Sequence, residues 1–144
     1  MKIIVIDGQG GKIGKIIVEE LKRVIPEQQI IAIGTNSIAT SVMLKAGADM
    51  GATGENPVIY NANDADIIIG SMGILVANSY LGEITPNMAL AIGKSKAEKI
   101  LIPINRCNIS IVGTQEIPYS EYAKMIAVQV KNMLDSNNNR LDIG

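Results

Sequence analysis

The sequence predicts an α/β protein in which helices cover both faces of a mainly parallel β-sheet. Short, uninterrupted apolar runs rich in isoleucine alternate along the chain with segments whose apolar residues fall on one helical face. Such runs are typical of strands buried on both faces, and their alternation with amphipathic helices indicates successive βαβ units. A glycine-rich turn joins the first strand to the first helix. Together these observations predict a Rossmann-like three-layer sandwich with a sheet of five to six strands.

A single domain is expected. The 144 residues fit one domain, because domains cluster near about 100 to 200 residues, and a separate substrate domain has no room. We expect this domain to span residues 1–135. A run of asparagines after Ser136 shows no periodicity, so residues 136–144 are expected to form a flexible polar tail.

Four strands and two helices are expected in the first half of the chain. The strands are predicted at residues 3–6, 30–33, 58–60 and 66–69. The first helix follows the glycine turn and ends before Pro26. The second helix begins at Asn36 or Ser37, either of which can cap it, and ends at Gly47. Residues 49–56 are rich in glycine and are expected to form a loop.

The second half continues the alternation of helices and strands. Residues 74–81 are expected to be helical. Thr85 followed by Pro86 places a capping residue before a proline at the first helical position, which predicts another helix. A fifth strand is expected at residues 100–104, and the last helix begins near Pro118.

A sixth strand is predicted at residues 109–112. Only the four residues 105–108 separate it from the fifth strand, whereas a parallel crossover needs about a dozen or more. We therefore expect the sixth strand to be an antiparallel edge strand.

The composition argues against several classes of protein. The chain has 13 basic and 14 acidic residues and a net charge of −1, which leaves no basic patch for nucleic acid. No apolar run approaches the roughly 18 residues that a membrane span needs, and the apolar run near the N-terminus is too short for a signal peptide. A cytoplasmic protein without a membrane partner is expected. Because 47% of the residues are hydrophobic and only 19% are charged, we also expect a homo-oligomer, most simply a homodimer.

The strongest functional signal is the turn between the first strand and the first helix. Its glycines are spaced G-x-x-G-x-x-G, a spacing also used in dinucleotide-binding folds. Glycines let a pyrophosphate approach the backbone, and the helix N-terminus offers free N–H groups and a partial positive charge. A nucleotide or dinucleotide, with NADP or NAD as the cofactor, is therefore expected to bind at Gly8, Gln9, Gly10, Gly11, Lys12, Ile13 and Gly14.

Two other interpretations of this turn stay open. The glycines can make a tight strand-to-helix turn that binds nothing. A Walker A phosphate loop is the weaker alternative, because Ile16 stands where a serine or threonine must reach magnesium. Asp7 would also bring a negative charge close to any phosphate, unless its carboxylate accepts a hydroxyl or a backbone N–H.

The end of the second strand lacks the residue that usually selects NAD. An acidic residue about 20 residues past the glycine loop accepts hydrogen bonds from the ribose in NAD sites. Here that place holds Gly34 and then Thr35, Asn36 and Ser37. We expect these three polar residues to bind the cofactor by donating to a 2′-phosphate, which favours NADP. The alternative is that they only cap the following helix.

Two further loops are expected at the same edge of the sheet, because ligands of open α/β sheets bind beyond the carboxyl ends of the strands. They add the candidate binding residues Gly70, Ser71, Met72, Gly73, Asn105 and Arg106. Arg106 can clamp a carboxylate or phosphate through two hydrogen bonds. The one cysteine, Cys107, is expected to be inert, since the chain has no histidine to act as its base. No catalytic residue and no metal site is assigned, and Glu55 and Glu83 are expected to be solvated or capping residues.

Several stretches of the sequence resemble a known family. IDGQGGKIG (residues 6–14), GTNSIAT (34–40), KAGAD (45–49), GATGEN (51–56), LGEITP (81–86) and INRCNI (104–109) are similar to domain-of-unknown-function family 3842, a group of short bacterial proteins. The resemblance extends to about Leu134. It implies a small Rossmann-like protein but assigns no activity to it. The glycine spacing alone is also similar to the cofactor loop of dihydrodipicolinate reductases, and no catalytic residue carries over.

Three hypotheses about function follow from the sequence. The first is a nucleotide- or dinucleotide-binding module, such as a sensor, that acts as a homodimer. The second is a small NAD(P)-dependent oxidoreductase whose site is completed by a second subunit, with Arg106 anchoring an acid. The third is a structural or assembly partner with an empty, vestigial loop.

Overall fold

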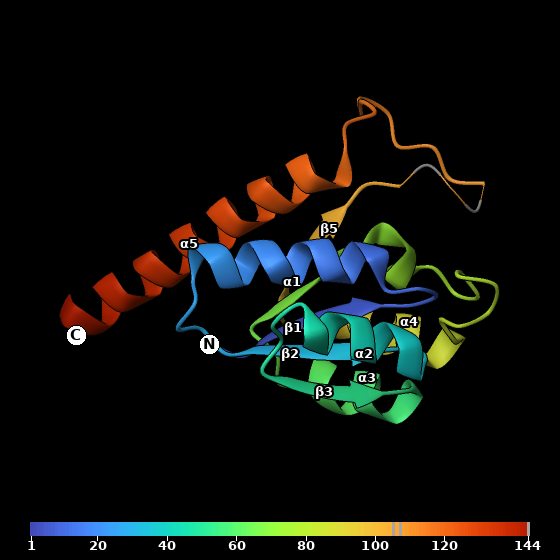
Figure 1. Cartoon of the computed structure of the whole chain (residues 1–144), viewed down its shortest axis with the longest axis horizontal. Coiled ribbons are helices and arrows are strands. Elements are labelled where there is room, and N and C mark those ends of the chain that lie inside the picture. Colours follow the sequence, from blue (N-terminus) through green and yellow to red (C-terminus); the bar gives the residue numbers. More distant parts are fainter. Residues whose placement is uncertain (105, 107, 144) are drawn as a thin grey trace.

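The computed structural model describes residues 1–104, 106 and 108–143 and confirms the α/β class. Figure 1 shows the order of the elements along the chain. They are β1 (Ile3–Asp7), α1 (Lys12–Val24), β2 (Ile30–Gly34), α2 (Ser37–Lys45), β3 (Met50–Thr53), α3 (Glu55–Ala62), β4 (Ile67–Ser71), the 3₁₀ helix η1 (Met72–Leu75), α4 (Pro86–Lys94), β5 (Glu98–Ile102) and α5 (Tyr119–Ile143).

The strands form one sheet in the order β3-β2-β1-β4-β5, and all four pairings are parallel. The chain moves outward from β1 to β3 and then returns to the other side of β1 to form β4. The order of the strands therefore reverses between β1 and β4. In open α/β sheets the crevice beyond the carboxyl ends of the strands at such a switch point is where ligands bind.

Helices cover both faces of the sheet, an arrangement consistent with the Rossmann type (Figure 1). Successive residues of β1 point to opposite faces, so Ile3 and Val5 enter one apolar core while Ile4 and Ile6 enter the other. The first core is closed by α1, α2 and α5, and the second by α3 and α4. Because β1 is fully buried, its carboxyl end lies in the middle of the molecule. No helix within the described residues is long and apolar enough to cross a membrane.

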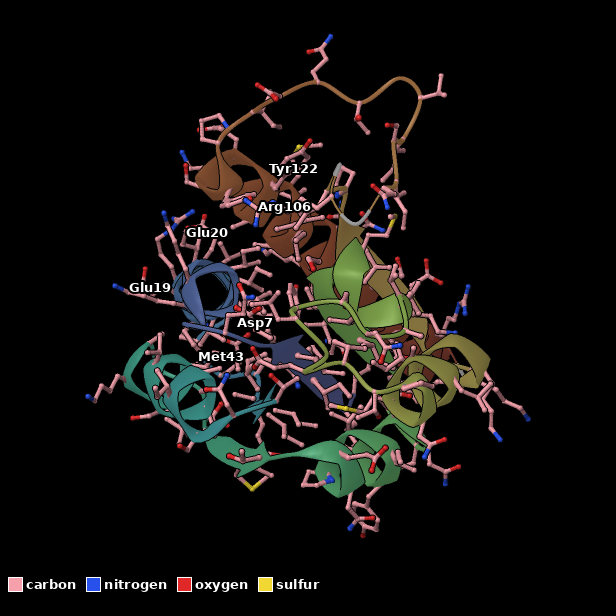
Figure 2. All side chains as sticks on the ribbon, turned by 90° about the vertical axis from the view of Figure 1, so that its right-hand side faces the viewer. Asp7, Glu19, Glu20, Met43, Arg106 and Tyr122 are labelled. Carbon is pink, nitrogen blue, oxygen red and sulfur yellow. The ribbon has the colours of Figure 1, made fainter. Side chains whose placement is uncertain are left out.

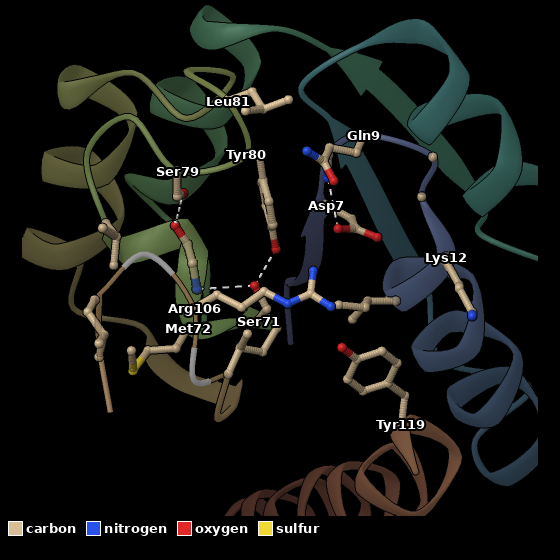
Figure 3. Close-up of a pocket in the computed structure, with 18 residues that line it drawn as sticks. Asp7, Gln9, Lys12, Ser71, Met72, Ser79, Tyr80, Leu81, Arg106 and Tyr119 are labelled. Carbon is tan, nitrogen blue, oxygen red and sulfur yellow. Dashed lines mark hydrogen bonds between the residues drawn. The ribbon is translucent and has the colours of Figure 1, made fainter. Parts of the chain in front are cut away.

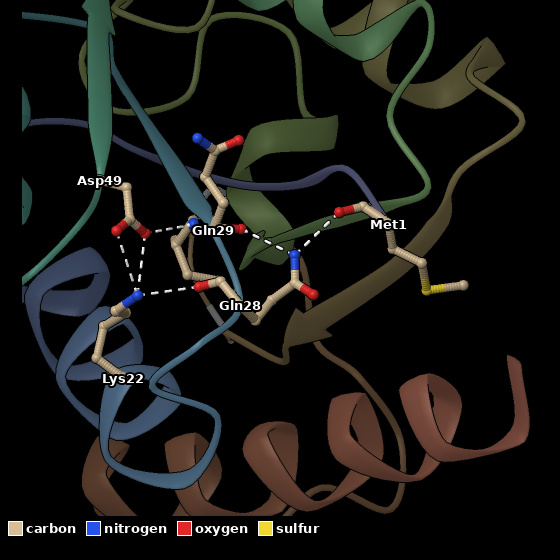
Figure 4. Close-up of polar contacts among 6 residues, drawn as sticks. Met1, Lys22, Gln28, Gln29 and Asp49 are labelled. Atoms are coloured by element: carbon tan, nitrogen blue, oxygen red, sulfur yellow. Dashed lines mark hydrogen bonds and ion pairs between the residues drawn. The ribbon is translucent and has the colours of Figure 1, made fainter. Parts of the chain in front are cut away.

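Polar contacts hold the opposite edge of the sheet, at the amino ends of the strands (Figure 4). Lys22 Nζ, near the end of α1, lies 3.0 Å from Asp49 Oδ2 and donates a 2.9 Å hydrogen bond to the carbonyl of Gln28. Asp49 Oδ2 also accepts a 2.7 Å hydrogen bond from the backbone N–H of Ile30, where β2 begins. These four groups satisfy one another, so this edge is held by structural contacts, and the candidate site lies at the other edge.

The capped helices agree with the sequence prediction. The Asn36 side chain accepts a 2.9 Å hydrogen bond from the backbone N–H of Ala39 at the start of α2. Thr85 accepts a 3.1 Å hydrogen bond from Met88 N–H, with Pro86 at the first position of α4. Each cap satisfies an N–H group that has no partner within its own helix.

The order of strand and helix between residues 49 and 62 was predicted wrongly. Residues 49–56 were expected to form a loop but contain β3, and residues 58–60 were expected to form a strand but lie in α3. Because β3 is an edge strand whose residues are largely exposed, it lacks the apolar run that identifies buried strands. In α3, Val58 and Ala62 are four positions apart and bury one helical face.

Residues 109–112 form no strand, so the predicted antiparallel edge strand is wrong. After β5 the described chain runs as turns and irregular structure until α5 begins at Tyr119. Left-handed φ angles at Asn108 (60°) and Gly113 (86°) turn the backbone on either side of the expected strand. Val112 is 99% exposed, so its apolar character does not report a buried strand.

Two further segments also differ from expectation. Residues 74–81 contain only the end of η1 followed by turns, because Asn78, Tyr80 and Leu81 adopt left-handed φ angles of 66°, 56° and 56° that no helix tolerates.

At the C-terminus α5 continues to Ile143. The asparagine-rich segment, which was predicted to be a flexible polar tail, is therefore helical.

The close contact of α1 with β1 and α2 predicts a position where a methyl group destabilises the fold. A Cβ atom at Gly14 would lie 2.5 Å from Met43 Sδ and 2.9 Å from Asp7 Cβ, and Figure 2 shows both residues beneath α1. We expect Gly14→Ala to lower the free energy of unfolding by about 1 to 3 kcal/mol through overpacking, measured by urea denaturation. Gly10→Ala is the matched control, because no atom lies within 4 Å of its added Cβ. Equal stability of the two variants would contradict this account of the contact.

Candidate functional site

A cavity of about 400 Å³ opens at the switch point between β1 and β4 (Figure 3). Its walls come from four parts of the chain: the glycine turn after β1, the end of β4 with η1, the turns after η1, and the segment between β5 and α5. The lining residues are Asp7, Gly8, Gln9, Gly10, Gly11, Lys12, Ile13, Ser71, Met72, Gly73, Val76, Ser79, Tyr80, Leu81, Ile104, Arg106, Ile109 and Tyr119.

The glycine turn has its shape because α1 and α2 approach each other closely. Gly11 has a left-handed φ of 73°, and a Cβ atom there would lie 2.9 Å from Ala39 Cα in α2. Gly11 N–H closes the turn with a 2.9 Å hydrogen bond to the carbonyl of Gly8. The left-handed φ and the close approach to Ala39 require glycine at position 11 whether or not a ligand binds.

Asp7 fills the inside of the turn. Its carboxylate is 4% exposed and accepts hydrogen bonds from the backbone N–H groups of Gly8 (2.8 Å) and Gly14 (2.6 Å). Burial raises the pKa of Asp7, the hydrogen bonds from Gly14 and Gly8 oppose this rise, and the negative charge of Glu83 adds to it. Asp7 thus binds backbone amides that the sequence assigned to a phosphate.

Two amides of the turn stay available. Gly10 and Lys12 line the cavity, and their backbone N–H groups make no hydrogen bond with the described part of the chain. They lie at the N-terminus of α1, where the helix dipole contributes a partial positive charge. This end of the cavity can therefore still receive an anionic group.

A buried pair of hydroxyl groups forms the wall at β4. Ser71 is 1% exposed and shares a hydrogen bond with the hydroxyl of Tyr80, and its Oγ also accepts a 3.1 Å hydrogen bond from Gly73 N–H. Burial raises the pKa of Tyr80 to about 12, although the hydrogen bond with Ser71 opposes the rise. Tyr80 therefore stays protonated at neutral pH and presents an uncharged surface.

Arg106 supplies a permanent positive charge opposite the glycine turn. In Figure 3 its side chain extends across the cavity, with Tyr119 of α5 beside it and Asp7 on the far side. A planar guanidinium can hold two oxygens of a phosphate or carboxylate at once. An anion between Arg106 and the amides of Gly10 and Lys12 would have a donor on each side.

Glu83 joins three segments just outside the cavity. Its Oε1 accepts hydrogen bonds from Thr35 Oγ1 (2.6 Å), Asn36 Nδ2 (2.6 Å) and the backbone N–H of Gln9 (3.0 Å). Partial burial disfavours its charge, but the hydrogen bonds from Thr35, Asn36 and Gln9 outweigh this effect and hold the pKa of Glu83 below its ordinary value. The expectation that Glu83 is a solvated or capping residue is wrong.

The structure gathers most, but not all, of the residues that the sequence selected. Of the candidates, the cavity is lined by Gly8, Gln9, Gly10, Gly11, Lys12, Ile13, Ser71, Met72, Gly73 and Arg106. The remaining described candidates are not among its lining residues: Gly14 lies on the buried face of α1, Thr35 and Asn36 bind Glu83, Ser37 begins α2 on the surface, and Gly70 is buried within β4. Asn105 and Cys107 lie outside the described residues.

The sequence revealed only part of the wall that the turns after η1 provide. Ser79, which follows the loop at residues 70–73, was expected at this edge of the sheet and lines the cavity. Val76, Tyr80 and Leu81 also line it but were not selected, because their segment was predicted to be helical. Their one sequence signal is Gly82, which follows this segment and has a φ of 90°. Nowhere in the described part of the chain do three or more acidic or cysteine side chains come together in a group that could hold a metal ion.

The hydrogen bonds of Glu83 predict a dependence of stability on pH. Because the folded-state pKa of Glu83 lies below its ordinary value of 4.5, its contribution to stability is present above that pH and is lost as the pH falls through the folded-state pKa. In urea denaturation we expect wild type to exceed Glu83→Gln in stability above about pH 5, with the difference shrinking on acidification. A difference that grows as the pH falls would contradict the assignment.

The chain matches a known family over nearly its whole length. The model of the family described as domain of unknown function (DUF3842) matches residues 2–135. No curated protein and no solved structure gives a match. The match agrees with the resemblance noted in the sequence, and this chain belongs to the family of domain of unknown function DUF3842.

Proposed function

We propose that the protein binds a nucleotide or dinucleotide, with its phosphates between the glycine turn and Arg106. The observation that carries this proposal is the cavity at the switch point, which has free helix N-terminal amides at Gly10 and Lys12 on one side and a guanidinium on the other. A helix N-terminus and an arginine both favour anions, and phosphate oxygens suit the spacing of a guanidinium.

The size and walls of the cavity suit part of a nucleotide. Its volume of about 400 Å³ falls within the range of roughly 300 to 1,000 Å³ that is usual for small-molecule sites. Met72, Val76 and Ile109 are apolar, and Tyr80 is uncharged, so this end can receive a flat heterocyclic ring. NAD and NADP, whose two nucleotides would extend from β2 to β4 across the turn, are the first ligands to test.

Asp7 supports a second candidate. Because its carboxylate holds the amides of Gly8 and Gly14, the turn is well satisfied without a ligand, as expected for a structural or assembly partner. Against this stand the cavity itself and the position of Arg106 in its wall. A reaction such as hydride transfer would also need a substrate beside the cofactor, and the residues that line the cavity do not identify one.

We further propose that the protein forms a homodimer. One face of α5 exposes two large apolar side chains three positions apart: Met125 is 61% and Val128 57% exposed. Apolar groups of this kind gathered along one helix are typical of association surfaces.

Calorimetric titration with NAD, NADP and ADP tests the binding site. A ligand with a Kd near 10 μM, supplied at about 1 mM, should stabilise the protein by about 2.7 kcal/mol and raise its melting temperature. We expect Arg106→Ala to weaken binding by about tenfold or more, because a charge-assisted pair of hydrogen bonds is lost.

Arg140→Ala is the matched control, since Arg140 is exposed on α5 far along the chain from the cavity. It removes the same charge and should leave binding unchanged. Failure of all three ligands to bind the wild type would overturn the proposal and favour the structural partner. Equal loss in both variants would show a nonspecific effect of charge.

A further inference from the structure

No acidic residue follows β2 in the sequence, but the carboxylate of Glu83 lies at the end of β2 in the structure. In dinucleotide sites of this fold an Asp or Glu that follows the second strand accepts a hydrogen bond from the ribose 2′-hydroxyl. Here Thr35 and Asn36 occupy that position in the sequence. Both donate to Glu83, which comes from the turns before α4, 47 and 48 residues farther along the chain.

We propose that Glu83 recognises the ribose of the bound nucleotide and selects ligands with a free 2′-hydroxyl, such as NAD, against those with a 2′-phosphate, such as NADP. This inference rests on the nucleotide binding proposed above. Glu83 would determine specificity from just outside the cavity, at the side of the glycine turn that faces β2.

The geometry places Glu83 where a ribose of such a ligand would lie. Its Oε1 is bound to the backbone N–H of Gln9, inside the glycine turn, as well as to Thr35 and Asn36 at the end of β2. A Cβ atom on Gly8 would lie 3.4 Å from the same oxygen. The carboxylate therefore stands between the turn and β2, which are the two elements that flank the ribose in this fold.

One oxygen of Glu83 stays available for a ligand. All three hydrogen bonds from the protein go to Oε1, and Oε2 has no partner among the described residues. The side chain is only partly buried, so solvent and ligand can reach it. A carboxylate oxygen can accept a hydrogen bond from a hydroxyl but has no proton to donate to a phosphate.

The same contacts reverse the preference that the sequence alone predicts. Thr35 and Asn36 were expected to donate to a 2′-phosphate, but their donor groups are directed at Glu83. These hydrogen bonds favour the ionised form of Glu83, and its negative charge would repel a phosphate placed beside it. Ser37, the remaining candidate, lies on the exposed first turn of α2.

The turns that carry Glu83 are held in an unusual conformation. Tyr80 and Leu81 both have a φ of 56°, which is unfavourable for residues with a Cβ atom. Four backbone hydrogen bonds close the segment on itself, including Asn78 N–H to Ile84 O at 2.7 Å and Glu83 N–H to Tyr80 O at 3.1 Å. Such strain persists where surrounding contacts fix a position, and here it brings the carboxylate to the end of β2.

Titration of wild type, Glu83→Gln and Glu55→Gln with NAD and NADP tests the proposal. Glu55 is the matched control: like Glu83 it accepts a hydrogen bond from a threonine hydroxyl, that of Thr85, but it is exposed and lies in α3. We expect wild type and Glu55→Gln to bind NAD about tenfold or more tightly than NADP. In Glu83→Gln, NAD should weaken and NADP should tighten, so that the preference falls by about tenfold or more. Circular dichroism and melting temperatures verify that each variant is folded.

Other outcomes separate this inference from the proposed function. If Glu83→Gln weakens NAD and NADP equally, Glu83 only ties the turns to β2, and the inference is overturned while nucleotide binding stands. The same holds if wild type binds NADP as tightly as NAD. If wild type binds neither NAD, NADP nor ADP, the proposed function fails and the role of Glu83 fails with it.

Discussion

The structure depends on the close contact between the start of α1 and the end of β1. Gly11 and Gly14 allow α1 to approach α2 and β1 more closely than any side chain permits. Asp7 then secures this corner from within, because its buried carboxylate accepts hydrogen bonds from Gly8 and Gly14. The fully buried strand β1 carries this corner into the centre of the molecule, so the cavity is bounded by the most constrained part of the chain.

The opposite walls of the cavity are built from less regular structure. The turns after η1 supply Tyr80 and Leu81, and the segment after β5 supplies Arg106. The corner proposed to bind an anion thus rests on the sheet and faces irregular loops that line the rest of the cavity. Such a division is common in α/β proteins, where the sheet fixes position and the loops provide specificity.

Features that depend on local chemistry could be predicted from the sequence. Buried strands such as β1 and β4 appear as apolar runs, and the cap at Asn36 identifies the start of α2. The edge strand β3 was missed because its residues are exposed. The role of Glu83 was missed for a different reason: it depends on hydrogen bonds to Thr35 and Asn36, which lie far away in sequence, and on left-handed angles at Tyr80 and Leu81 that carry no sequence signal.

The carboxyl group buried at the end of β1 also bears on the thermodynamics of the cavity. Its proton affinity is already increased by burial, and a second negative charge above the glycine turn would increase it further. If the proposed anion binds there, its association is coupled to proton uptake by Asp7, and by reciprocity a lower pH strengthens the complex. If the proposed phosphate binding holds, this chain without a single histidine would have an affinity that depends on pH through Asp7.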